Sequence, residues 1–169
     1  KEWGLPTEET ILLGESAGGH LAALVATTPA FTPDPADDLA ESTPLLIDRL
    51  ILLYPVILAD GPYAHASIVR TLGPTASDQL KKEVSPDLRV SSDLPPTLVF
   101  HAVDDAVVSV ANSLAFARAA WAVKADLELQ IFPRGGHGRA FAYDEEISPR
   151  WRETVRTWLD RAPRVSRDR

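Results

Sequence analysis

A serine between two glycines is the part of this 169-residue sequence with the clearest chemical meaning. Ser16 lies between Gly14 and Gly18, shortly after an apolar run over residues 11–13. A helix-forming sequence follows the serine. This G-x-S-x-G pattern is typical of a nucleophile elbow, where a strand delivers a serine to a turn so tight that only small neighbours fit. The pattern alone arises by chance in roughly one chain in twenty of this length. The flanking strand and helix favour a nucleophile over a serine that merely makes a turn.

A serine hydroxyl needs an imidazole to take its proton and a carboxylate to orient that imidazole. The sequence offers Asp104 and Asp105 after a later apolar run, and then His137 in a glycine-rich loop. Each of these positions follows the end of an expected strand, where open α/β sheets place their chemistry. The backbone N–H of Ala17 is expected to be one donor to the oxyanion that forms during acyl transfer.

The other three histidines have simpler interpretations. His20 lies on the expected buried helix and is interpreted as a packing or hydrogen-bonding residue, and His101, within an apolar strand, as structural. His65 is interpreted as an exposed loop residue, with substrate contact as the alternative.

No metal or cofactor is expected. His101, Asp104, Asp105 and His137 could be imagined as ligands, but their spacing matches no zinc signature. The two aspartates already have a use in the proton-transfer chain, which makes a metal site the weaker alternative.

Four strands must position these side chains: Thr10 to Leu13, Leu50 to Val56, Thr97 to Val103 and Leu127 to Phe132. The first three are continuous apolar runs, as expected of strands covered on both faces of a parallel sheet. The fourth alternates apolar and polar residues, which indicates a sheet edge. Strands that alternate with helices predict an α/β fold.

Three longer helices and one short helix are expected between and after the strands. Residues 21–26 are apolar on every side and predict a fully buried helix that Pro29 ends. Ser109 is expected to cap a second helix, with Asn112 and Arg118 pointing away from its apolar stripe. That stripe consists of Val110, Leu114, Ala117 and Trp121.

Ser148 and Pro149 predict the start of the last helix. Its apolar face is expected to consist of Trp151, Val155, Trp158 and Leu159. Residues 29–44 are predicted to form an acidic solvated loop, and residues 77–83 a short helix.

Composition limits the class of protein. Hydrophobic residues make up 45% of the sequence, charged residues 24%, and the formal net charge is −7. This composition fits one soluble domain and argues against nucleic acid or an anionic membrane as a partner. We expect residues 1–162 to be part of that domain, with residues 59–96 as a cap-like excursion and residues 163–169 as a flexible basic tail.

The sequence starts at Lys1 and contains neither methionine nor cysteine. Because a translated protein starts with methionine, we expect it to be an internal or carboxy-terminal part of a longer protein, and the absence of a visible targeting segment favours the cytoplasm.

Several motifs together resemble one family. They are the segments 14–20, 53–56, 85–90, 95–97, 101–108 and 135–138. In these segments the chain resembles the α/β-hydrolase esterases grouped with acetyl xylan and feruloyl esterases, over nearly its whole length except the tail. The resemblance implies a three-layer αβα fold with a mostly parallel sheet, of which this chain supplies the last four strands.

The resemblance also assigns roles. The acid is the aspartate two residues before a Val-Val pair, which is Asp105, and Asp104 would orient the loop. Ser109 stands where the family commonly has proline. A His-Gly-Gly motif that would supply a second oxyanion donor is absent from the sequence. The isolated piece is thus expected to be inactive or nearly so, and to leave the edge of its first strand unpaired.

These features predict a serine hydrolase that cleaves carboxylic esters of small molecules or carbohydrates through an acyl-enzyme. The family expectation is an acetyl or related ester on plant polysaccharide. The alternatives are a serine peptidase of the prolyl-oligopeptidase type and a non-catalytic binding module with the same fold.

Overall fold

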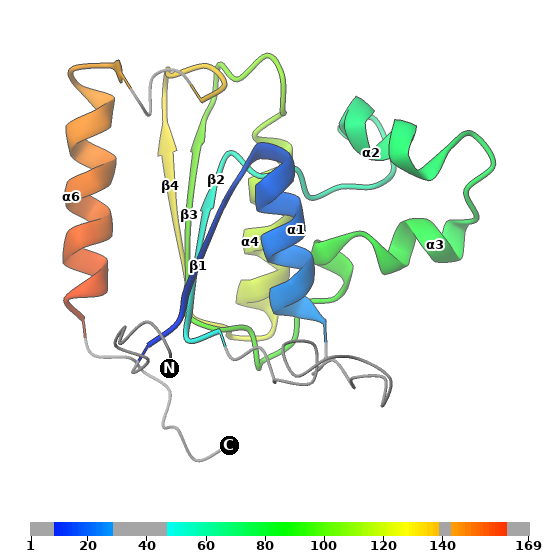
Figure 1. Cartoon of the computed structure of the whole chain (residues 1–169), viewed down its shortest axis with the longest axis horizontal. Helices are drawn as coiled ribbons and strands as arrows, with labels where there is room; N and C mark the ends of the chain where they lie inside the picture. The colour runs from blue at the N-terminus through cyan, green and yellow to red at the C-terminus, as the bar shows by residue number, and fades with distance from the viewer. Residues whose placement is uncertain (1–8, 29–46, 139–142, 162–169) are drawn as a thin grey trace, which may run out of the picture.

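The computed structural model describes residues 9–28, 47–138 and 143–161. Its centre is a parallel sheet in the order β1-β2-β3-β4, so that strands adjacent in the sequence are adjacent in space (Figure 1). The strands are β1 (Ile11–Glu15), β2 (Arg49–Leu53), β3 (Thr97–Ala102) and β4 (Leu127–Phe132). All four predicted strands are confirmed. The second ends at Leu53 rather than Val56, because Tyr54 has a φ of 38° and leaves the extended conformation.

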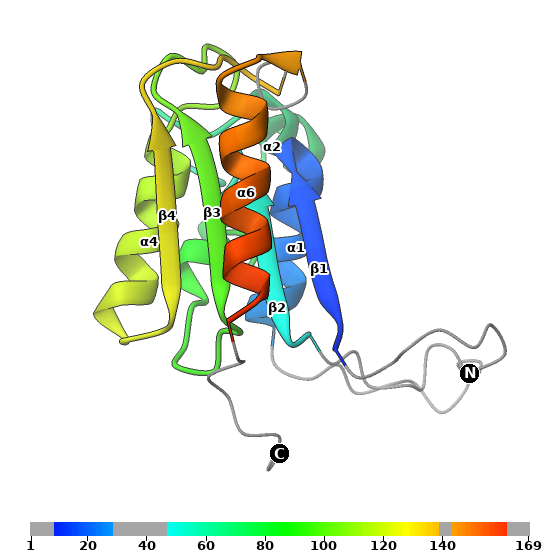
Figure 2. The same cartoon turned by 90° about the vertical axis from the view of Figure 1, so that its left-hand side faces the viewer.

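Helices cover both faces of the sheet. The helices α1 (Ser16–Thr27) and α4 (Ala111–Ala122) lie on one face, and α6 (Ile147–Leu159) lies on the other (Figures 1 and 2). This arrangement confirms the predicted three-layer αβα architecture.

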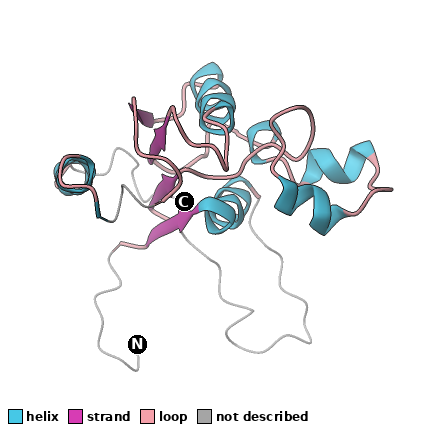
Figure 3. Ribbon diagram, turned by 90° about the horizontal axis from the view of Figure 1, so that it is seen from above, coloured by secondary structure: helices cyan, strands magenta, loops and turns pink. Residues whose placement is uncertain are grey.

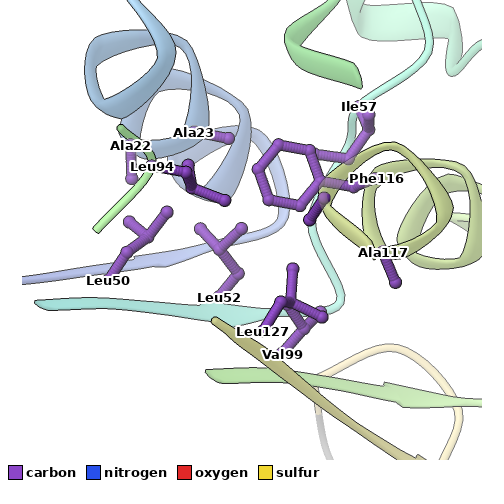
Figure 4. Close-up of a cluster of buried hydrophobic side chains, with 11 residues drawn as sticks. Ala22, Ala23, Leu50, Leu52, Ile57, Leu94, Val99, Phe116, Ala117 and Leu127 are labelled. Carbon is purple, nitrogen blue, oxygen red and sulfur yellow. The ribbon is translucent and has the colours of Figure 1, made fainter. Parts of the chain in front are cut away.

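Alternating side chains of the strands divide the core in two. Leu50 and Leu52 of β2 point towards α1 and α4, where they pack with Phe116 (Figure 4). Ile51 and Leu53 of the same strand belong to the second cluster, which packs against α6. Because successive side chains of a strand point to opposite faces, a central strand covered on both sides must be apolar throughout. The full burial of β2 and β3 confirms that prediction.

The same prediction is wrong for β1. Ile11 and Leu13 of this strand are 41% and 50% exposed. Among the described residues β1 pairs with β2 alone, so it lies at one edge of the sheet. The unpaired edge expected for this strand is therefore present in the described structure, and β4 forms the opposite edge, as predicted.

Helix α1 is buried on one side rather than on every side. Ala22 and Ala23 face the sheet, whereas Leu21 is 62% exposed. Apolar character around a whole helix does not by itself bury it, because a helix packed on one face of a sheet keeps its outer side open.

The predicted apolar stripe of α4 is wrong for two of its four members, while Ala117 is buried as predicted. Leu114 and Trp121 are exposed, and Asn112 is fully buried. The Asn112 side-chain oxygen accepts hydrogen bonds from the backbone N–H groups of Ile57 and Leu58, both at 2.9 Å. Because these bonds satisfy the amide, a polar residue takes a core position. The residues that α4 buries are Asn112, Ser113, Phe116, Ala117 and Ala120.

Two predicted helix starts are shifted. The Ser109 hydroxyl accepts a hydrogen bond from the N–H of Ala111, but Val110 is the residue that precedes α4. Helix α6 starts at Ile147, because the Asp144 carboxylate accepts hydrogen bonds from the N–H groups at its beginning, while Ser148 is buried. The predicted apolar face of α6 is confirmed, since its four residues belong to or pack against the second core cluster.

The excursion between β2 and β3 extends beyond α1, away from the sheet (Figures 1 and 3). It contains α2 (Ala66–Leu72), α3 (Asp78–Glu83) and the 3₁₀ helix η1 (Pro86–Leu88). Helix α3 confirms the predicted helix, and the Ser77 hydroxyl caps it by accepting from the N–H of Leu80. Helix α2 was not predicted. His65 is its N-cap, half-buried, with ring Nδ1 accepting from the N–H of Ser67, so the interpretation of His65 as an exposed loop residue is wrong.

The predicted acidic loop at 29–44, the stop at Pro29 and the basic tail at 163–169 lie outside the described residues. None of the helices in the described ranges has the length and apolar character that a membrane crossing requires.

Candidate active site

Three side chains that are far apart in the sequence form one hydrogen-bonded chain. The Ser16 Oγ lies 2.8 Å from Nε2 of His137, and Nδ1 of the same imidazole lies 2.8 Å from Oδ2 of Asp105. The three residues follow β1, β4 and β3 in turn, at the end of the sheet where parallel strands place their carboxyl termini. The geometry is that of a nucleophile, a base and a carboxylate that orients the base.

Ser16 occupies a strained backbone position. Its φ is 51°, in the left-handed region that a residue with a side chain seldom adopts. The turn is held from outside by the N–H of Val56, which donates to the carbonyl oxygen of Ser16 at 3.0 Å. Ser16 is also the first residue of α1, so the N–H of Ala17 is among those that lack a partner within the helix. The positive end of the helix dipole is directed at the same place.

Two glycines let this turn approach its neighbours closely. A Cβ on Gly14 would lie 2.5 Å from the carbonyl oxygen of Gly18, and one on Gly19 would lie 2.8 Å from Cβ of Pro55. A Cβ on Gly18 would meet nothing within 4 Å. The tight turn thus depends on Gly14, as predicted, and on Gly19, while the predicted need for glycine at position 18 is not supported in the described structure.

This difference leads to a matched pair of variants. Gly19→Ala is expected to lower the free energy of unfolding by about 1–3 kcal/mol, because α1 must move away from Pro55. Gly18→Ala is expected to leave it unchanged or raise it slightly, since alanine favours helix. Denaturant unfolding of both variants measures the difference. Equal stabilities would contradict the close approach of Gly19 to Pro55.

The Asp105 carboxylate is buried and rigidly held. The Asp105 side chain is inaccessible, and its Oδ1 accepts hydrogen bonds from the N–H groups of Val107 and Val108, both at 2.9 Å. Its other carboxylate oxygen, Oδ2, accepts the hydrogen bond from Nδ1 of His137. Asp104 is exposed instead, and its Oδ1 accepts from the N–H of Gly136 at 2.8 Å. Asp105 therefore contacts the imidazole, whereas Asp104 connects the loop after β3 to the loop after β4.

His137 lies in a loop that only glycine-rich sequence can form. Gly136 and Gly138, on either side of it, have φ values of 58° and 78°. Its ring is 20% exposed and packs edge-to-face against Tyr54, with 4.8 Å between ring centroids. The imidazole is thus held by a carboxylate on one nitrogen and an aromatic ring at its side.

A second histidine lies behind the acid. His101 is fully buried, and its Nε2 donates to the carbonyl oxygen of Val108 at 2.9 Å. Its Nδ1 accepts from the Ser113 hydroxyl at 2.7 Å. The same Nε2 is 3.4 Å from Asp105 Oδ2. Burial lowers the pKa of His101, so the ring stays neutral and supports the loop of Asp105. This agrees with its interpretation as a structural residue.

The buried His101 makes stability depend on pH. An unfolded imidazole has a pKa near 6.5, so below about pH 6.5 the unfolded chain binds a proton at this position that the folded protein does not. As the pH is lowered below about 6.5, the free energy of unfolding is then expected to fall by about 1.4 kcal/mol per pH unit from this group alone. The fall ends where the pH reaches the lowered pKa of His101 in the folded protein. His101→Gln keeps a donor for Val108 and should remove that part of the slope. Denaturant unfolding between about pH 7.5 and 5.5 measures it, and equal slopes in both proteins would contradict a neutral His101.

His20 confirms its interpretation as a hydrogen-bonding residue. Its Nε2 donates to the carbonyl oxygen of Val84 at 2.8 Å and joins α1 to the excursion. Within the described ranges, no three or more histidine, aspartate and glutamate side chains are arranged as a metal-binding group.

Sequence reasoning missed one side chain at this site. The hydroxyl of Tyr54 donates to Oε2 of Glu15 at 2.7 Å, while its ring contacts His137. Burial, followed by the Glu15 carboxylate, raises the pKa of Tyr54, so its hydroxyl keeps the proton that it donates. In the sequence, Tyr54 could have been singled out because the segment Leu53–Val56 is one of those that carry the family resemblance, although this segment has no catalytic group.

The chain is similar to several known proteins. Residues 1–119 match the BD-FAE family. The chain is 32% identical over 154 residues to endo-1,4-beta-xylanase B of Butyrivibrio fibrisolvens, which is 87% of this chain and 23% of that protein. It is 27% identical over 173 residues to the acetylxylan esterase of Xylanibacter ruminicola, covering 99% of this chain and 34% of that protein.

A solved structure is also similar. The acetyl ester-xyloside bifunctional hydrolase from Caldicellulosiruptor lactoaceticus is 38% identical, with a TM-score of 0.78 over 87% of this chain and 54% of that one. The chain thus spans about half the length of that structure and about a third or less of the two curated relatives. The parallel sheet and these neighbours together identify an α/β-hydrolase fold, as predicted. Since the family match extends over most of the sequence, the chain belongs to the BD-FAE family.

Proposed function

We propose that this chain carries the nucleophile, acid and base of a serine hydrolase that cleaves carboxylic esters. The observation that supports this most strongly is the continuous chain of hydrogen bonds from Ser16 through His137 to Asp105. Each member has the chemical type and the atom that the reaction requires.

The proposed reaction starts at the serine. His137 Nε2 takes the proton of the Ser16 hydroxyl while Oγ attacks the ester carbonyl carbon. Asp105 accepts the hydrogen bond of Nδ1–H, which fixes the tautomer and stabilises the imidazolium that forms. The imidazolium then gives its proton to the departing alcohol, leaving the acyl group on Ser16. A water molecule, activated by the same imidazole, releases the acid and restores the hydroxyl.

The negative charge on the carbonyl oxygen needs donors in place before the reaction. The N–H of Ala17 is proposed as one of them, because it lies next to Ser16 in the first turn of α1. The helix dipole favours negative charge at the same point. Such a donor contributes roughly 3–4 kcal/mol to the stability of the transition state.

The proposed substrates are acetyl or related acyl esters, on small molecules or on plant polysaccharide. Two proteins similar to this chain support this choice, since one is named acetylxylan esterase and the other an acetyl ester-xyloside hydrolase. The backbone strain at Ser16 and the burial of Asp105 support catalysis over a binding module with the same fold, because a binding module has no need of either.

The test uses the product of the complete gene with two chromogenic substrates and one polymer. Hydrolysis of p-nitrophenyl acetate and release of acetate from acetylated xylan are expected, without cleavage of a prolyl p-nitroanilide. Cleavage of the anilide but not of the ester would indicate a peptidase of the prolyl-oligopeptidase type. Failure to turn over any of the three would contradict the proposed function.

A further inference from the structure

Tyr54 connects the two loops that bring nucleophile and base together. It directly follows β2 and is 5% exposed, with its backbone N–H donating to the carbonyl oxygen of Phe100 at 2.7 Å. Its φ of 38° is unfavourable for a tyrosine, so the surrounding contacts must hold it in place. Strain of this kind at a buried aromatic residue calls for an explanation beyond packing.

On one side, Tyr54 reaches the nucleophile elbow. Its hydroxyl donates to Oε2 of Glu15 at 2.7 Å, and Glu15 is the residue immediately before Ser16. A hydrogen bond to a carboxylate is stronger than one between neutral groups. The position of the phenol is therefore fixed relative to the turn that presents the Ser16 hydroxyl.

On the other side, Tyr54 reaches the loop of the base. Its ring packs edge-to-face on the His137 imidazole, with an interplanar angle of 64°. The backbone of the loop also lies against the phenol, since a Cβ on Gly138 would be 3.3 Å from the Tyr54 hydroxyl oxygen. His137 thus has one nitrogen on Asp105, the other on Ser16, and its ring held laterally by Tyr54.

We propose that Tyr54 is a positioning residue that holds the His137 imidazole in line with Ser16, with Glu15 as its anchor. This inference rests on the proposed function, because it concerns the base of that reaction. Asp105 alone fixes one point of the imidazole and permits the ring to rotate about it. The lateral contact with Tyr54 restricts that rotation and keeps Nε2 directed at Oγ.

The test compares variants in the complete gene product with p-nitrophenyl acetate as substrate. Tyr54→Phe keeps the ring and removes the anchor, and is expected to lower kcat about tenfold, the value of one such hydrogen bond. Tyr54→Leu also removes the aromatic contact and is expected to lower kcat about 100-fold through misplacement of the base. KM should stay within about twofold in both, since the proposed role is in the chemical step rather than in binding. Glu15→Gln, which retains an acceptor, should lose less than Glu15→Ala.

A double-mutant cycle separates positioning from general stability. In a His137→Ala background, Tyr54→Phe is expected to cause no further loss of the residual rate, because the residue through which it acts is gone. A Tyr54→Phe loss of equal size in both backgrounds would overturn the proposal, as would a Tyr54→Leu protein with the kcat of the unmodified enzyme. Tyr143→Phe, at a tyrosine that is 82% exposed, serves as the matched control. An inactive unmodified protein would refute the proposed function itself, whereas an active one that tolerates these changes refutes only the role of Tyr54.

Discussion

Ser16→Ala in the complete gene product is expected to lower kcat for p-nitrophenyl acetate by about 10⁴- to 10⁶-fold, because it removes the proposed nucleophile that carries the acyl group. The hydrogen bond between Ser16 and His137 is lost with the hydroxyl, but the fold should remain, since alanine fits wherever serine does. KM is expected to change little. Steady-state kinetics together with circular dichroism measure the two effects.

A matched control for this variant is Ser92→Ala, at an exposed serine in the segment before β3. This change is expected to leave kcat unaltered. A Ser16→Ala enzyme with more than about a hundredth of the original kcat would show that the ester is cleaved elsewhere, because a lost nucleophile costs far more than that.

Asp105→Asn is expected to lower kcat by about 10⁴-fold with little loss of stability. The amide oxygen of asparagine can still accept hydrogen bonds from Val107 and Val108, which keeps the loop in place. Its amide nitrogen then replaces Oδ2 beside Nδ1 of His137, and this nitrogen can only donate a hydrogen bond. The imidazole must accept there and carry its proton on Nε2, which prevents it from taking the proton of Ser16.

Asp104→Asn provides the matched comparison, since it makes the same chemical change one residue away. Its side-chain oxygen can still accept from the N–H of Gly136, so a loss of about tenfold or less is expected. Kinetics of the two variants side by side decide which aspartate is the acid. A greater loss in Asp104→Asn than in Asp105→Asn would reverse the assignment.

The parts of the fold that depend on local patterns could be predicted from the sequence. Continuous apolar runs identified the buried strands β2 and β3, and alternation identified β4 as an edge. The elbow at Ser16 was predictable because a strained turn requires glycine at defined positions, here Gly14. The choice of Asp105 over Asp104 came from the family resemblance, and in the structure Asp105 is the buried aspartate that contacts His137.

The parts that depend on contacts between distant segments could not be predicted. The buried face of α4 includes Asn112, which is a core residue because the turn after β2 supplies backbone donors to its side chain. A pattern of apolar residues contains no information about such partners. The left-handed conformation of Tyr54 and its bridge from Glu15 to His137 have the same origin, since both come from tertiary contacts rather than from the residue type.

The covalent chemistry of Ser16 is the central claim, and it can be measured directly. The complete gene product, treated with an organofluorophosphonate, is expected to gain one adduct, which peptide mass spectrometry places on Ser16, with esterase activity lost in proportion to labelling. Asp105→Asn should slow the labelling as it slows turnover, because both reactions need the same base. Loss of activity with the adduct on another residue, or full activity with Ser16 completely labelled, would contradict the account.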